Sequence, residues 1–322
     1  MLASIPSPSE SVIELGPLTL RAYGVMIAFG VVAAVLLSQR RWTARGGNPD
    51  DISTIALWAV PAGLIGARAY HVLTDWRFDE GWAQPFKIWE GGLGIPGGIA
   101  AGVLVGLWMI RRNGWDQPTL LDAIVPGLPL AQAIGRWGNY FNQELFGGPS
   151  DLPWAVEIDP DVAASAGHRG VETFHPTFLY ESLWNLGLTL FLVWVDRTGK
   201  LRRGALLAVY VVGYLVARLW LETIRVDPAT EVGGARINIW MSIIGIVIAG
   251  GFFSGTDRRG VFSFEYFNTT HLFDGKTYTR LPDMPRRQLY PGREVPVLAL
   301  GGARRRARRR VVPPAVQQPT AK

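Results

Sequence analysis

The chain has 322 residues, of which 48% are apolar, and it carries a formal net charge of +6 with no cysteine. Its mean hydropathy is +0.17, and its apolar residues gather in blocks of about 20, the length that crosses a bilayer. This composition excludes an ordinary soluble enzyme, and the lack of cysteine excludes disulfides and catalysis by a thiol of the protein itself.

Seven apolar segments approach the length of a membrane span, which predicts an all-α polytopic membrane protein. They are residues 22–39, 52–74, 93–110, 119–135, 176–195, 204–223 and 237–254. We expect the first to be an uncleaved helix, because no basic residue precedes it before Arg21, which is the wrong flank for a signal peptide. The fourth is the weakest, since Pro126, Gly127 and Pro129 interrupt it, and neighbouring helices must compensate such a break.

The basic residues predict the orientation of the chain. They follow the first, third, fifth and seventh segments, at Arg40, Arg41, Arg45, Arg111, Arg112, Arg197, Lys200, Arg202, Arg203, Arg258 and Arg259. Because short loops rich in positive charge stay in the cytoplasm, we expect the N-terminus outside and the C-terminus inside. Residues 136–175 then form a small head piece on the outer face of a membrane domain covering residues 1–255.

Residues 256–322 are polar and contain scattered prolines. This composition buries little apolar surface, so we expect a basic cytoplasmic tail that is partly disordered. The arginines between residues 304 and 310 could bind anionic lipid headgroups at about 1 kcal/mol per residue. They could equally be a solvated end without a specific partner.

A polar, glycine-rich cluster ends the fourth segment. Arg136, Asn139, Asn142 and Glu144 lie within nine residues there. An arginine fork binds a phosphate through two N–H groups, and amides or carboxylates bind hydroxyls. The same residues would also suit a helix-end cap with an Arg–Glu ion pair, and composition favours neither interpretation.

His175 and Pro176 begin the fifth segment, and Glu181 lies inside its apolar run. Pro176 suits the first turn of a helix, which puts His175 at the outer mouth of that helix, as a base or as a cap. A charge in a membrane segment costs about 2.5–3.5 kcal/mol on insertion scales, so Glu181 needs a partner or a function. Arg68 in the second segment is a further polar group, whereas Tyr23 alone is typical of the membrane interface.

The sixth segment carries a polar stripe, since Tyr214, Arg218, Glu222 and Arg225 fall on one face of a helix. Such a stripe faces protein or a water-filled cavity rather than lipid. Arg218 and Glu222 could merely form an i,i+4 pair that lowers the cost of insertion, and the pattern alone slightly favours that interpretation.

These polar groups share one location under the predicted topology. The Arg136 cluster, His175 and Glu222 all lie near the outer leaflet, which indicates a site for a lipid phosphate that opens to the outside. The four histidines are scattered, so we expect neither a metal nor another cofactor. We expect no nucleic-acid partner.

The pattern Gly135-Arg136-x-Gly-Asn139-x-x-Asn142-x-Glu144-x-x-Gly147 resembles the signature of prolipoprotein diacylglyceryl transferases. The same family is similar, in the same order, at four other places: Arg21–Gly24, Ile88–Gly92, His175–Glu181 and Tyr214–Arg225. The resemblance therefore covers residues 20 to about 250. It implies a seven-helix fold with a small periplasmic head, in the bacterial inner membrane.

The resemblance also implies the reaction and its partners. Such an enzyme transfers the diacylglyceryl group of phosphatidylglycerol to the lipobox cysteine of prolipoprotein signal peptides, releasing glycerol 1-phosphate, as the first step of bacterial lipoprotein modification. Our candidate catalytic residues are Arg136, Arg218, Glu144 and His175. The candidate substrate-binding residues are Tyr23, Arg68, Asn139, Asn142, Gly147, Glu181, Tyr214, Glu222 and Arg225.

One departure from the family concerns the base. Many members have a histidine in the glycine-rich segment before the third helix, and Pro96 stands there in this chain. Proline cannot accept a proton, so either His175 or Glu181 supplies the base, or a dedicated base is not required.

Two other functions deserve comparison. A lipid transporter or flippase would also present arginines to a headgroup, but it should show inverted repeats and a site near the midplane. An intramembrane protease should carry a Gly-x-Ser-x-Gly or His-Glu-x-x-His motif, and the sequence contains neither.

Overall fold

The structure, a computed structural model, describes residues 4–8, 11–15, 18–75, 86, 92–199, 201–226, 231–258, 270–273 and 276–279. Most of the predicted tail, residues 256–322, and most of the Ile88–Gly92 motif lie outside the described residues. The described part of the chain is mostly helical, which confirms the predicted all-α class.

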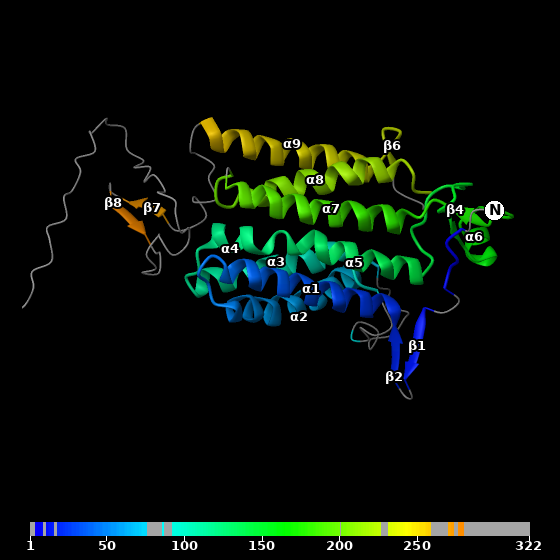
Figure 1. Cartoon of the computed structure of the whole chain (residues 1–322), viewed down its shortest axis with the longest axis horizontal. Coiled ribbons are helices and arrows are strands. Elements are labelled where there is room, and N and C mark those ends of the chain that lie inside the picture. The colour runs from blue at the N-terminus through cyan, green and yellow to red at the C-terminus, as the bar shows by residue number, and fades with distance from the viewer. Residues whose placement is uncertain are drawn as a thin grey trace, which may run out of the picture.

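The long helices run side by side along the length of the molecule (Figure 1). The helices are α1 (Ala22–Thr43), α2 (Pro49–Thr74), α3 (Ile95–Arg112), α4 (Gln117–Ile124), α5 (Gly127–Phe141), α6 (Pro160–Ser165), α7 (Thr177–Thr198), α8 (Leu206–Glu222) and α9 (Ile237–Arg258). In the described ranges, four of them (α1, α2, α3 and α7) are long and apolar enough to cross a membrane, and the apolar part of α9 is shorter. The chain is a polytopic membrane protein, and the count of seven spans stays a prediction.

The fourth predicted segment is broken where its prolines indicated. Helix α4 ends at Ile124 and α5 begins at Gly127, with Pro126 directly before it. Helix α5 then continues to Phe141, so residues 136–141 belong to the helix and the head begins later than the sequence indicated. Gly138 allows this last part of α5 to pack closely against α1, because a Cβ at Gly138 would lie 2.6 Å from the ring of Tyr23 on α1.

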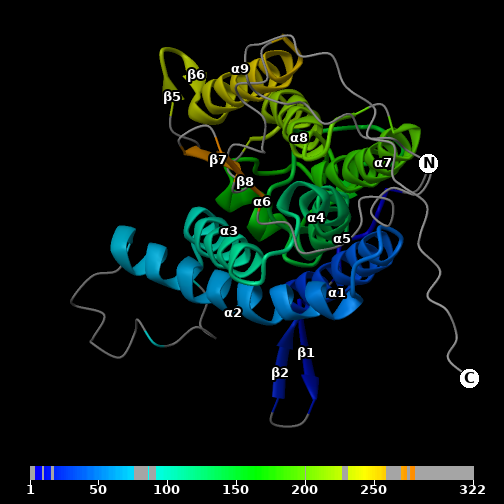
Figure 2. The ribbon, with the colours of Figure 1, turned by 90° about the vertical axis from the view of Figure 1, so that its left-hand side faces the viewer.

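The helices pack as a series of neighbours, which Figure 2 shows end-on. Helix α3 lies on α2, α2 on α1, α1 on α5, α5 on α7, α7 on α8, and α8 on α9. Helices α2 and α3 approach most closely at two glycines, since a Cβ on Gly97 would lie 2.3 Å from the carbonyl oxygen of Gly66. Small residues allow this approach between membrane helices. The packing order brings α5, α7 and α8 together, and these helices carry the arginines predicted to bind phosphate.

Short antiparallel strand pairs precede, connect and follow the helices along the chain. They are β1 (Val12–Leu15) with β2 (Leu18–Arg21), β3 (Val156–Glu157) with β4 (Thr173–Phe174), β5 (Glu231–Val232) with β6 (Ala235–Arg236), and β7 (Thr270–Phe273) with β8 (Lys276–Thr279). The β1–β2 hairpin and a head made of β3, α6 and β4 lie at the same end of the bundle (Figure 1). The head has a small core that includes Phe146, Phe174 and Phe178.

A buried ion-pair network joins the helices at the opposite end. Arg41 Nη2 lies 3.2 Å from Asp196 Oδ2, and Arg45 pairs with the same carboxylate. Asp122 of α4 accepts a hydrogen bond from the backbone N–H of Gly204 at 2.6 Å. Arg41 of α1 and Arg45, just after it, are two of the arginines used to predict the orientation, and they also connect this end of α1 to α7.

Candidate active site

Arg136 lies near the end of α5, and its side chain reaches α7. Its Nε lies 2.5 Å from Glu181 Oε2, and its Nη1 donates a hydrogen bond to Asn139 Oδ1 at 3.3 Å. Glu181 is buried, whereas the Arg136 side chain is one-fifth exposed. The carboxylate inside the apolar run of α7 thus has its partner, and the ion pair of Arg136 is with Glu181 rather than with the nearby Glu144.

Glu144 joins this group through Asn139. Asn139 is buried, and its Nδ2 donates to Glu144 Oε1 at 2.6 Å. Gln143 and Leu145 flank Glu144 with φ angles of 50° and 59°, in the left-handed region that non-glycine residues rarely adopt. Such strained conformations gather at functional sites. Tyr23 of α1 adjoins Asn139 and Glu144, so α1 and the loop after α5 close one side of the group.

Arg218 belongs to a second group, centred on Glu222. Arg218 Nη2 lies 3.2 Å from Glu222 Oε2, without the alignment of a hydrogen bond, so this contact is an electrostatic one. Glu222 Oε1 forms an ion pair with Arg236 Nε at 2.9 Å and accepts a hydrogen bond from Asn238 Nδ2 at 3.0 Å. Glu222 is buried and connects α8 with β6 and α9. Glu222 is therefore more than the partner of Arg218 in a local i,i+4 pair, since it also holds a turn outside its own helix.

Arg236 and Asn238 were not among the predicted site residues. Their signal was one polar side chain directly before the last apolar segment and one at its start, where β6 meets α9. Nothing in the sequence pairs that turn with Glu222, because the contact depends on how α9 returns along α8.

A small cavity connects the two groups. It is lined by Glu181, Asn185, Tyr214, Ala217, Arg218 and Leu221. Glu181 pairs with Arg136 and faces the same cavity as Arg218. Arg136 therefore contacts this buried carboxylate directly, and Arg218, on a separate helix, lines the cavity that the carboxylate also lines.

His175 and Gly147 meet at the N-terminal end of α7. The Gly147 N–H donates to the His175 carbonyl at 2.9 Å, and the His175 N–H donates to the Gly148 carbonyl at 2.9 Å. A Cβ on Gly147 would lie 2.7 Å from the His175 Cβ, so a side chain at residue 147 would not fit. His175 Nδ1 lies 3.2 Å from the Tyr180 hydroxyl, and Arg225 forms a β-bridge with Gly147.

Other candidates lie apart from the two arginine groups. Asn142 ends α5 with an exposed side chain. Arg68 is buried in α2, where Nη1 donates to the Gly92 carbonyl at 3.1 Å, so it belongs to the α2–α3 pair. Pro96 occupies the first turn of α3, a position that suits proline.

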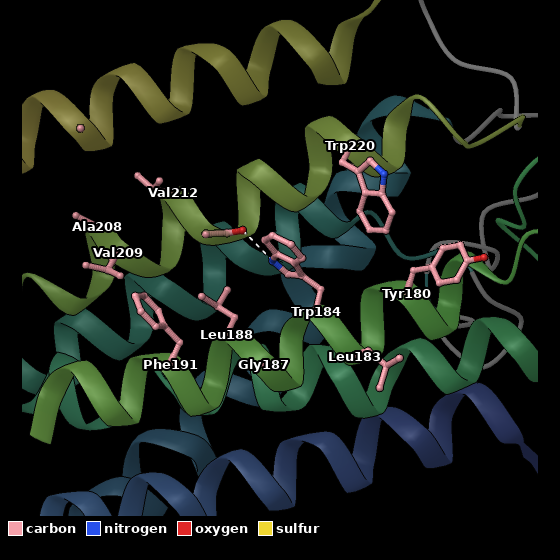
Figure 3. A pocket seen from close by; sticks show the side chains of 12 residues that line it. Tyr180, Leu183, Trp184, Gly187, Leu188, Phe191, Ala208, Val209, Val212 and Trp220 are labelled. Atoms are coloured by element: carbon pink, nitrogen blue, oxygen red, sulfur yellow. Dashed lines mark hydrogen bonds between the residues drawn. The ribbon is translucent and has the colours of Figure 1, made fainter.

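An apolar groove of about 840 Å³ runs between α7 and α8 (Figure 3). Tyr180 and Trp220 form its head-side end, with ring centroids 5.9 Å apart. Trp184 Nε1 donates to the Gly213 carbonyl at 3.0 Å and links the two helices across the groove. Because Tyr180 also contacts His175, the groove begins beside the candidate site.

Known proteins share this sequence over most of its length. Residues 10–254 match the family of prolipoprotein diacylglyceryl transferases. The chain is 52% identical, over 253 residues, to the phosphatidylglycerol–prolipoprotein diacylglyceryl transferase of Streptomyces griseus, covering 77% of this chain and 76% of that one. It is 53% identical to transferase 1 of Streptomyces coelicolor, covering 77% and 72%, and 48% identical to the transferase of Mycobacteroides abscessus, covering 76% of each chain. The chain therefore belongs to the prolipoprotein diacylglyceryl transferase family.

Proposed function

We propose that this chain transfers the diacylglyceryl group of phosphatidylglycerol to the cysteine thiol of prolipoproteins, with Arg136 and Arg218 binding the lipid phosphate. The observation that carries the assignment of these residues is that Arg136 pairs with Glu181, which lines the same small cavity as Arg218. A guanidinium has five N–H donors. Within the described ranges, Arg136 uses two of its nitrogens on protein partners, so it keeps donors for phosphate oxygens.

The reaction is an alkyl transfer. The thiolate of the substrate cysteine attacks the C3 carbon of the lipid glycerol, a C–S bond forms, and the C–O bond to the phosphate breaks. The electron pair goes to the phosphate oxygen, and glycerol 1-phosphate leaves. Cationic groups lower the pKa of a nearby thiol from about 8.5. Arg136 and Arg218 would thus favour the thiolate and stabilise the charge that develops on the departing phosphate.

The remaining candidates would position these groups. Asn139, Glu144 and Tyr23 would hold Arg136 and the lipid hydroxyls, while Glu222, with Arg236 and Asn238, would hold Arg218. We place the protein in the bacterial inner membrane with seven spans, the head outside and the basic tail inside. The head lies at one end of the helices (Figure 1). Arg136 and Arg218 lie near the C-terminal ends of α5 and α8, and the segments that follow these two helices meet at the Gly147–Arg225 bridge. The head and both arginine groups thus share one end of the bundle, which supports this orientation.

The groove between α7 and α8 would hold an acyl chain of the donor. From Tyr180 to Phe191, α7 rises about 16 Å, which is close to the length of an extended acyl chain of a phospholipid. The residues that line the groove are almost all apolar, so it suits a hydrocarbon chain.

A transfer assay tests the proposed function. Purified protein incubated with phosphatidylglycerol and a lipobox peptide should yield a peptide heavier by one diacylglyceryl group, with glycerol phosphate released. A flippase would leave the peptide unchanged, and a protease would cut it. Peptide of unchanged mass in the presence of folded protein would contradict the proposal.

We propose His175 as the base that receives the thiol proton, directly or through Tyr180. His175→Ala should slow transfer about tenfold at pH 7, where a free cysteine is only a few per cent thiolate. The defect should shrink at pH 9, because the substrate thiol then ionises without help. Initial rates at both pH values would measure it. A defect of equal size at the two pH values would contradict the proposal that His175 acts as a base.

A further inference from the structure

Asn185 of α7 is a buried polar residue that the proposed reaction does not yet use. It is 3% exposed, and its side-chain carbonyl oxygen is buried without a hydrogen-bond partner among the described residues. Asn185 lies one helical turn beyond Glu181 and lines the same cavity. An unpaired amide oxygen is costly in a membrane interior, where bulk water cannot satisfy it. The position therefore calls for a donor that the protein does not supply.

The cavity has the size and the chemistry for one such donor. Its volume is about 10 Å³, which corresponds to about one water-sized probe. Its polar walls are Glu181 and Asn185 on α7 and Tyr214 and Arg218 on α8. A hydroxyl group can donate to the Asn185 oxygen while it accepts from Arg218, and a buried water needs two to four such partners.

We infer that this cavity binds a single O–H group, held by Asn185, that bridges the Glu181 and Arg218 sides of the site. The inference rests on the proposed function. The O–H group comes either from a water molecule or from the headgroup glycerol of the lipid donor. In both cases Asn185 is a positioning residue, because it acts on the phosphate-binding arginines through the group that it holds.

The test compares Asn185→Leu with Thr189→Val. Leucine has the same branched arrangement of four side-chain heavy atoms as asparagine but offers no acceptor. Thr189 lies one turn further along α7, is equally buried, and its hydroxyl bonds the backbone carbonyl of Asn185 at 2.9 Å; it does not line the cavity. For each protein we would measure kcat and KM with phosphatidylglycerol, and the inhibition constant of phosphatidylethanol, which has the phosphate but no headgroup hydroxyl.

Two results would support the inference and identify the source of the O–H group. For a headgroup hydroxyl, Asn185→Leu should raise KM for phosphatidylglycerol about tenfold, the effect of one lost hydrogen bond, and leave the inhibition constant of phosphatidylethanol unchanged. For a water molecule, the same variant should lower kcat and weaken both lipids together. Thr189→Val should match the wild type throughout.

Values of kcat, KM and the inhibition constant within twofold of wild type in a folded Asn185→Leu protein would overturn the inference. If that variant does not fold, Asn185→Ser and Asn185→Ala replace it, since they differ by one hydroxyl oxygen. Serine should then retain the activity that alanine loses, and equal activities would overturn the inference. An inactive wild-type protein would instead contradict the proposed function, so the two failures are distinguishable.

Discussion

Arg218→Ala is expected to reduce transfer by a factor of about 10²–10³, the usual effect of removing one donor from a site that stabilises developing negative charge. The loss should appear in kcat, because the phosphate gains charge as the C–O bond breaks. Folding should suffer less than activity, since Arg236 and Asn238 still contact Glu222 in the variant. Single-turnover transfer to a lipobox peptide measures the first effect, and thermal unfolding in detergent measures the second.

Arg136→Ala should lose activity to a similar extent but should also be less stable. It leaves Glu181 buried without its cationic partner, and breaking a buried ion pair typically costs about 3–5 kcal/mol. Arg136→Lys separates the two effects, because lysine keeps the charge and loses the two-pronged fork. Arg169→Ala is the matched control, since it removes an exposed positive charge from the head. Full activity in folded Arg218→Ala would contradict the proposal that Arg136 and Arg218 together bind the lipid phosphate.

Local sequence properties predicted most of the fold. Apolar blocks of membrane length located the helices, and Pro126 located the break between α4 and α5. The polar stripe at Tyr214, Arg218 and Glu222 predicted that one face of α8 meets protein, and Tyr214 and Arg218 do line a cavity. These predictions were correct because helix periodicity and proline geometry depend only on residues that are near one another in the sequence.

The partners within the site could not be predicted in the same way. Arg136 has Glu144 eight residues away in sequence, yet its ion pair is with Glu181, because α5 packs on α7. Arg236 reaches Glu222 only because β6 lies beside the end of α8. Each of these pairs depends on which helices become neighbours, and that choice is made by packing across the whole bundle.

The groove offers a test that separates the acyl chains from the headgroup. Gly187 lines it, and a Cβ added there would meet no atom within 4 Å. Gly187→Trp should therefore fold, helped by the higher helix propensity of tryptophan, and fill the groove. The bilayer is as apolar as the groove, so the groove orients an acyl chain rather than attracting it. Its blockage should misplace the reacting carbon, and a displacement of about 1 Å can cost about 10²-fold in rate.

Donors of two chain lengths make this prediction specific. Gly187 lies about 10 Å along α7 from Tyr180, beyond the reach of the short chains of dihexanoyl phosphatidylglycerol. Gly187→Trp should thus lose about 10²-fold in kcat/KM with a long-chain donor and act like the wild type on the dihexanoyl donor. Leu190→Trp, on an exposed part of α7 outside the groove, should change neither. Equal losses with both donors would indicate a distorted helix, and no loss with either would mean that bulk lipid fills the groove while the donor's chains lie elsewhere.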